Sequence, residues 1–170
     1  MSVERHVFPT DPRHAPLLRA LMALDGSTTK VCEALARRPV TVQLHRQRQT
    51  DDVPAAVRAH LGGTRWLERV TSLHAHGRVM MDNLSYTRLD AVPDWFLAGL
   101  DAGQAPVGHL LARMFVQRER LASDTALSDA LWAHVGAPDT AASRTYRVVT
   151  PDAPLMLIFE AWRDGMVVPA

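Results

Sequence analysis

The chain has 170 residues, of which 47% are hydrophobic and 22% charged, so it holds enough apolar surface for one globular domain and is not disordered throughout. Its 19 basic and 18 acidic residues give a formal charge of +1, which argues against a nucleic-acid-binding protein, since such domains carry a strongly basic face. The single cysteine, Cys32, excludes a disulfide framework and a cysteine zinc site within one chain.

The first part of the chain alternates helical and strand patterns. Leucines spaced as on one face of a helix predict an amphipathic helix over 14–25. Ser27 is placed to cap a second helix that carries Cys32. From Pro39 onward, apolar residues alternate with polar ones and predict a strand. A short helix is expected over 55–61, after a turn or loop.

The remaining elements follow one another at hairpin lengths. Gly77 reads as the turn of a hairpin between two long strands, and prolines precede two of the later helices. The strands are expected at 65–76, 78–88, 115–123, 143–150 and 154–162, and the helices at 94–100, 107–114 and 127–135. About six strands in close succession favour a mostly antiparallel sheet, and hence the α+β class.

One strand carries a charge on its more apolar face. Between 65 and 76, Arg69 shares a face with Leu67, Thr71 and Leu73. Burying an unpaired guanidinium is costly, so an inward Arg69 needs an anionic partner. That partner is either a carboxylate of the protein or the carboxylate of a ligand, which a guanidinium binds through two parallel hydrogen bonds.

The last strand repeats this pattern with the opposite charge. The run 155–159 is apolar on both faces, which is typical of a central, covered strand, and Glu160 follows it. Desolvation disfavours the ionised form of such a carboxyl, which is how a general acid or base is tuned towards neutral pH. The alternative is a structural ion pair of Glu160 with Arg69 or Arg147.

Other possible sites have weaker signals. His74 and His76 share a strand face, but no firm third ligand accompanies them, so no metal site is expected. Cys32 is expected in the core rather than as a nucleophile. Arg48, on an alternating series of arginines and glutamines, fits a solvated face or a second anion contact at a pocket mouth.

Several short motifs, taken in order, resemble the chorismate pyruvate-lyase family. They comprise Asp25–Lys30, the strand around Val42 with Arg46 and Arg48, Trp66–Arg69, Ala105–Gly108, and the pair Tyr146–Val148 and Pro154–Glu160. None of them is highly specific alone, but their order and spacing together are. The resemblance runs from about Leu17 to Trp162, which is most of the chain.

The resemblance implies a six-stranded antiparallel sheet with helices packed around a buried ligand cavity. Family members remove pyruvate from chorismate and leave 4-hydroxybenzoate, without a cofactor or metal. Arg69 would then bind a substrate carboxylate, the backbone at Val107 would assist it, and Glu160 would meet the ring hydroxyl or the ether oxygen. Thr28 stands where the family commonly has a larger apolar side chain, and Leu84 where some relatives have a charged one.

Two other functions stay open at this point. Thr28 and Leu84 are compatible with a related enzyme that runs an elimination or dehydration on a different small acid. A non-catalytic domain that binds a small acid is the third possibility, because effector domains of some transcription regulators share the general fold. In each case the expected partner is a small carboxylate rather than a nucleic acid or a membrane, and a monomer is the default.

No export signal or membrane span is visible in the sequence. Residues 1–15 contain charges and prolines but no apolar run, so no signal peptide is indicated. No stretch approaches 18 consecutive apolar residues. We therefore expect a soluble, cytoplasmic protein with one domain over 1–170, in which residues 1–13 form a loosely ordered tail.

Overall fold

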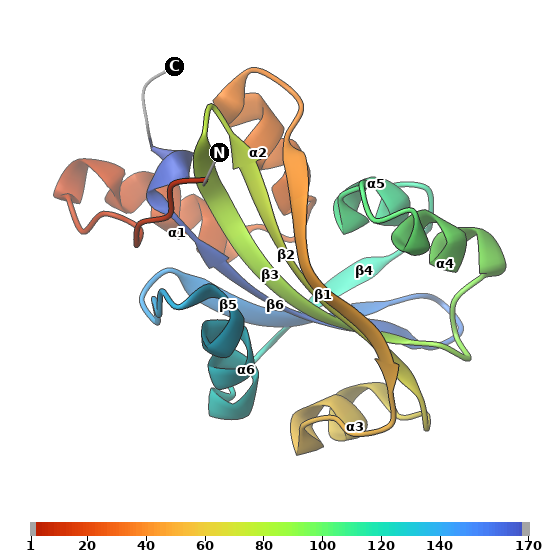
Figure 1. Ribbon diagram of the computed structural model, residues 1–170. Coiled ribbons are helices and arrows are strands. Elements are labelled where there is room, and N and C mark those ends of the chain that lie inside the picture. Colours follow the sequence, from red (N-terminus) through yellow and green to blue (C-terminus); the bar gives the residue numbers. More distant parts are fainter. Residues whose placement is uncertain (1–2, 168–170) are drawn as a thin grey trace.

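A computed structural model describes residues 3–167 and has a six-stranded antiparallel sheet at its centre (Figure 1). The strand order is β1-β2-β3-β6-β5-β4, so the hairpin of β2 and β3 lies beside the C-terminal strand. The strands are β1 (Thr41–Thr50), β2 (Trp66–Ala75), β3 (Arg78–Arg88), β4 (Gln117–Leu121), β5 (Ser143–Val149) and β6 (Pro154–Trp162). The predicted α+β class and antiparallel sheet are confirmed.

Six α-helices and two short 3-10 helices precede, connect or follow these strands within residues 3–167. The α-helices are α1 (Ala15–Ala23), α2 (Thr28–Ala36), α3 (Ala55–Leu61), α4 (Asp94–Asp101), α5 (Val107–Leu111) and α6 (Thr125–Val135). The 3-10 helices are η1 (Pro12–His14) and η2 (Asp164–Met166). Ser27 caps α2 as expected, its side chain accepting a hydrogen bond from the Lys30 amide. None of these helices is long and apolar enough to cross a membrane.

The helices divide between the two faces of the sheet. The pairs α1–α2 and α4–α5 pack on the face that carries Arg69 and Glu160, which we call the ligand face, and α3 and α6 cover the opposite face (Figure 1). On the opposite face a single apolar cluster joins both helices to β2, β3 and β6, around Val70 and Phe159. The ligand face instead holds two separate apolar clusters, one under each helix pair.

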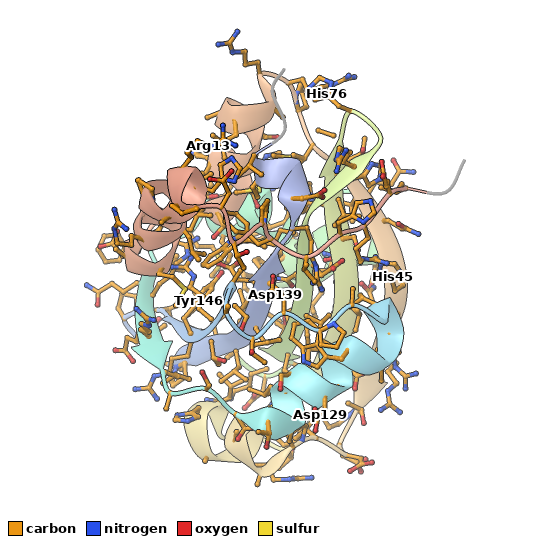
Figure 2. All side chains as sticks on the ribbon, turned by 90° about the vertical axis from the view of Figure 1, so that its left-hand side faces the viewer. Arg13, His45, His76, Asp129, Asp139 and Tyr146 are labelled. Atoms are coloured by element: carbon orange, nitrogen blue, oxygen red, sulfur yellow. The ribbon has the colours of Figure 1, made fainter. Side chains whose placement is uncertain are left out.

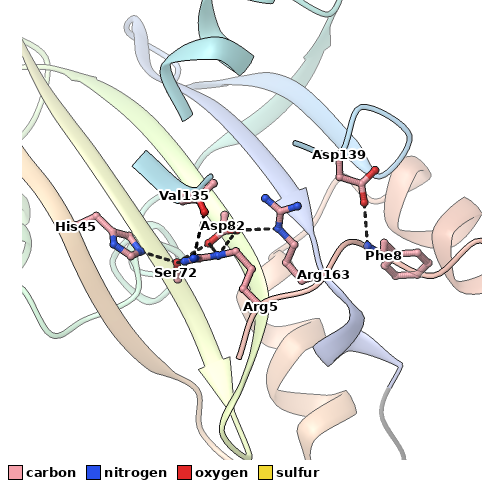
Figure 3. Close-up of polar contacts among 8 residues, drawn as sticks. All are labelled: Arg5, Phe8, His45, Ser72, Asp82, Val135, Asp139 and Arg163. Atoms are coloured by element: carbon pink, nitrogen blue, oxygen red, sulfur yellow. Dashed lines mark hydrogen bonds and ion pairs between the residues drawn. The ribbon is translucent and has the colours of Figure 1, made fainter. Parts of the chain in front are cut away.

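The N-terminal segment is tied to the sheet rather than loose, which corrects the expected tail for residues 3–13. Arg5 donates through Nε to Asp82, which is fully buried and also accepts from Arg163 Nε at 2.7 Å (Figure 3). Phe8 is buried as well, and its amide donates to Asp139 at 2.9 Å. A buried carboxylate and two arginines therefore fix this segment in place, a long-range contact that local sequence patterns do not reveal.

A serine and a histidine in the same cluster do not form a nucleophilic site. His45 Nε2 lies 2.7 Å from Ser72 Oγ, but the carboxylate of Asp82 also contacts the serine instead of orienting the histidine (Figure 3). A serine nucleophile needs a base that is in turn held by the acid. The cluster therefore acts as an anchor for the N-terminal segment.

Cys32 is expected to be unreactive in the folded protein. Its side chain is fully buried, and burial together with the nearby charge of Glu160 raises the pKa of the thiol well above its usual range. Because the thiolate is the reactive form, 5,5′-dithiobis(2-nitrobenzoate) should label it only after unfolding. Absorbance of the released thiolate, followed in buffer and in denaturant, measures this; rapid labelling in buffer would contradict the burial.

Candidate functional site

Buried polar side chains fill the gap between the two apolar clusters of the ligand face. Cross-strand pairing aligns Thr71 with Asn83 and Asn83 with Glu160, and one step along the sheet it aligns Arg69 with Ser85. All five side chains are buried. Since buried polar groups cost free energy unless they are paired, this row beneath two helix pairs is the candidate for a polar site.

Glu160 lies at the centre of this row and is held by three side chains. Its Oε1 accepts hydrogen bonds from Thr28 Oγ1 at 2.9 Å and from Arg144 Nε at 2.7 Å, and its Oε2 accepts from the Tyr146 hydroxyl at 3.2 Å. Figure 2 places Tyr146 in the interior of the molecule. Burial and the charge of Glu160 raise the pKa of this tyrosine, so its hydroxyl stays a donor.

The ion-pair partner of Glu160 is Arg144, which the sequence analysis did not single out. The two alternatives that it named do not occur: Arg147 pairs with Glu119 on the opposite face, and Arg69 contacts backbone carbonyls. Arg144 also donates to Thr28 Oγ1 at 3.0 Å and to the Leu24 carbonyl, so it ties the start of α2 to β5 and β6. Arg144 shares a strand face with Tyr146. A charge on that face is a sequence signal that could have identified it.

Arg69 is a buried cation without a counter-ion among residues 3–167. It is 2% exposed, and its Nη2 donates to the carbonyls of Gly103 at 3.2 Å and Ala105 at 3.4 Å. Its Nε is buried and makes no hydrogen bond. Burial alone lowers the pKa of Arg69 to about 10, and no carboxylate opposes that effect. Arg69 therefore does not form the ion pair with a carboxylate of the protein that the sequence allowed.

The helices α2 and α5 meet directly above the polar row. A side chain added at Gly108 would lie 2.9 Å from Thr29 Cβ and closer still to its hydroxyl, so only glycine permits this approach. Thr28, which contacts Glu160, thus comes near the start of α5 at Val107, and Arg69 contacts the loop just before it. The structure therefore brings four of the six predicted site residues to one region.

Replacing Gly108 with alanine is expected to separate these two helices. The new methyl group has to displace Thr29, and such overpacking typically costs about 1–3 kcal/mol of unfolding free energy. Urea unfolding measures that loss. Gly99→Ala is a matched control, because there the new methyl group meets the flexible end of Leu110 away from α2. Equal behaviour of both variants would contradict the proposed contact.

The two other predicted site residues, Arg48 and Leu84, lie on the opposite face. Arg48 pairs with Glu68 at 3.2 Å, and Leu84 is buried in the cluster under α3 and α6. Arg48 lies on that face because β1 contains a bulge. Leu44 pairs with Thr71, but Arg46, two residues later, pairs with the next residue of β2, Val70. The extra residue reverses the alternation, so the arginines leave the ligand face.

The comparisons with known proteins agree with this architecture. The family model described as Chorismate pyruvate-lyase Rv2949c-like matches residues 22–166. The chain belongs to this family. The matched range contains all four residues that the structure gathers on the ligand face of this family member: Thr28, Arg69, Val107 and Glu160. A comparison with curated proteins gave no match.

Solved structures with this fold include a domain of a repressor. The C-terminal domain of the histidine utilization repressor from Pseudomonas syringae pv. tomato str. DC3000 has a TM-score of 0.52 and 11% identity, covering 77% of this chain and 96% of that chain. PhnF from Mycobacterium smegmatis has a TM-score of 0.51 and 13% identity, covering 99% of this chain and 91% of that chain. At such identities the likeness establishes the fold of this chorismate pyruvate-lyase family member and nothing about its activity.

Proposed function

We propose that this protein eliminates pyruvate from chorismate and leaves 4-hydroxybenzoate, without a cofactor. The observation that carries the proposal is the buried, unpaired guanidinium of Arg69 on the same sheet face as the buried carboxylate of Glu160. A substrate carboxylate would give Arg69 the counter-ion that residues 3–167 do not provide. The family to which the chain belongs supports this choice of substrate.

The spacing of the two charged groups fits a small ring acid. Arg69 pairs across β2 and β3 with Ser85, Ser85 pairs with Ile158 of β6, and Glu160 follows two residues later. At about 4.8 Å between strands and 3.3 Å per residue, the two backbones are about 12 Å apart. A ring acid with a carboxylate at one end and a hydroxyl at the other could meet both side chains at this separation of their backbones.

The proposed reaction requires that the protein orient the substrate and provide one proton acceptor. As the anionic half of an ion pair, Glu160 is suited to accept the hydrogen from the ring carbon that bears the hydroxyl. The electrons of that C–H bond complete the aromatic ring, and those of the adjacent C–O bond leave with the enolpyruvate oxygen. The proton then goes to the methylene carbon of enolpyruvate and forms pyruvate. A direct transfer of that hydrogen to the methylene carbon needs only positioning.

The experiment is a balance of products. Purified protein is mixed with chorismate in the presence of a chelator and without added cofactor, and pyruvate and 4-hydroxybenzoate are measured together. We expect equal amounts of both, at a rate well above that of chorismate alone. Pyruvate with a different aromatic product would keep chorismate as the substrate but reject the proposed regiochemistry. If folded protein forms no pyruvate and no 4-hydroxybenzoate, the proposed lyase activity is rejected.

A second candidate is a domain that binds a small carboxylic acid without converting it. It is favoured by the contacts of Glu160, whose oxygens already accept from Arg144, Thr28 and Tyr146 in this structure. One of the solved structures with this fold is a domain of a repressor. Tight binding of 4-hydroxybenzoate by calorimetry, combined with no turnover of chorismate, would select this candidate.

A further inference from the structure

A small cavity adjoins the Glu160 ion pair on the side of β4 and β5. It has a volume of about 140 Å³ and is lined by Leu24, Asp25, Arg118, Arg120, Arg144 and Tyr146, together with Met22 and Ala23. Tyr146 and Arg144 both line it and contact Glu160 through hydrogen bonds. The cavity is therefore separated from the catalytic carboxylate by no more than these two side chains.

Strand alternation explains why the cavity is rich in arginine. Within β4, Arg118 pairs with Val148 and Arg120 with Tyr146, so both arginines lie on the ligand face. Glu119 between them points to the opposite face, where it pairs with Arg147. The one acidic residue of β4 therefore does not neutralise Arg118 and Arg120 at the cavity.

The charges around this cavity are not balanced by the protein. Of the lining residues three are arginines and one, Asp25, is acidic and exposed. Arg144 is neutralised by Glu160, but neither Arg118 nor Arg120 forms an ion pair within residues 3–167. Arg120 is exposed and donates to the Met22 carbonyl at 3.1 Å, whereas Arg118 is half-buried and its Nε is buried without a hydrogen-bond partner. An unpartnered guanidinium nitrogen at a cavity wall calls for an anion.

We propose that this cavity binds the carboxylate of the three-carbon acid that the reaction releases, with Arg118 as its principal ligand. The inference rests on the proposed function, in which the substrate is a dicarboxylate: Arg69 takes the carboxylate on the ring, and the arginines of β4 and β5 take the one on the leaving group. Arg118 and Arg120 are then the residues that select a dicarboxylate over a ring acid with one carboxylate.

The size of the cavity agrees with this assignment. A cavity of about 140 Å³ holds more than one water and is large enough for a small polar group such as a carboxylate. A second hollow of about 490 Å³ on α1 shares Met22, Ala23 and Arg120 with it.

The test uses sodium pyruvate as the probe on the full chain, with saturation-transfer NMR as the readout. We compare the unaltered protein with Arg118→Gln, with Arg69→Met, and with Arg38→Gln, which removes the same charge from an exposed position at the end of α2. Pyruvate should bind in the millimolar range, Arg118→Gln should weaken it about tenfold or more, and the other two should leave it unchanged. Circular dichroism confirms that each variant is folded.

Two results would overturn the inference: no pyruvate binding by the unaltered protein, or binding that Arg69→Met abolishes and Arg118→Gln leaves intact. If chorismate is turned over, Arg118→Gln should also raise the KM for chorismate about tenfold while the affinity for 4-hydroxybenzoate stays within about twofold. If chorismate is not turned over but the variants still change pyruvate binding as expected, the lyase activity is rejected and the carboxylate site is supported. The failure of the proposed function is thus distinguishable from the failure of this inference.

Discussion

Replacing Arg69 with methionine is expected to abolish tight binding of 4-hydroxybenzoate and, at the same time, to raise the melting temperature of the ligand-free protein. Burial lowers the pKa of Arg69 to about 10, so its surroundings disfavour the charged form by on the order of 3 kcal/mol. Methionine fills a similar volume without charge. The hydrogen bonds to the Gly103 and Ala105 carbonyls are lost, at about 1 kcal/mol each.

The net gain in stability is therefore about 1 kcal/mol, or a rise of roughly 2–4 °C in melting temperature for a domain of this size. The loss of binding follows from the charge-assisted hydrogen bonds between guanidinium and carboxylate, which account for a factor of about 100 in affinity. Calorimetric titration with 4-hydroxybenzoate and differential scanning calorimetry of the free protein give both numbers.

A matched control is Arg147→Met. That arginine also lies on a strand, but it is paired with Glu119 and donates to the His60 carbonyl on the opposite face. Its replacement should leave affinity unchanged and should not raise stability. If Arg69→Met binds 4-hydroxybenzoate normally, Arg69 is not the carboxylate ligand. If it loses binding and is strongly destabilised, its contacts to the carbonyls serve the fold and the ligand role is unsupported.

Much of the fold followed from the sequence because hydrophobic alternation and turn residues act locally. The hairpin around Gly77, for example, has the predicted strands on both sides, and Gly77 adopts a positive φ of 73°. α5 ends at Leu111, three residues before the expected end, because the following residues turn towards β4. The tie of Arg5 to Asp82 joins residues 77 positions apart, and no local pattern predicts such a contact.

The sequence predicted those site residues whose charge interrupts an apolar strand face. It misplaced a residue where the alternation of side chains along the strand changes. Arg69 and Glu160 were found by their charge on an apolar face. Arg144 has the same signal, since it shares a strand face with Tyr146, but the sequence-based prediction named Arg147 as a partner of Glu160 instead. Arg48 was predicted near the site because regular alternation from Leu44 places both residues on the same face. The bulge in β1 reverses that alternation. Bulges arise from pairing with the neighbouring strand, so the sequence of one strand does not show them.

The ion pair of Glu160 and Arg144 gives the second large expected effect. Replacing Glu160 with glutamine leaves Arg144, which is 5% exposed, without a counter-charge, and breaking a buried pair in this way typically lowers the unfolding free energy by about 3–5 kcal/mol. The double variant Arg144→Met, Glu160→Met removes both charges and should recover most of that loss. Urea unfolding of Arg144→Met, of Glu160→Met and of the double variant measures the coupling between the residues.

The same variants separate a structural role of Glu160 from a catalytic one. If Glu160 accepts the ring proton, turnover of chorismate should fall about 10²- to 10⁴-fold in Glu160→Gln, with a much smaller change in the affinity for 4-hydroxybenzoate, which Arg69 dominates. The double variant regains stability and should still be inactive. Turnover that returns with stability in the double variant would show that Glu160 only holds the fold together, since no carboxylate is then left at that position to accept the proton.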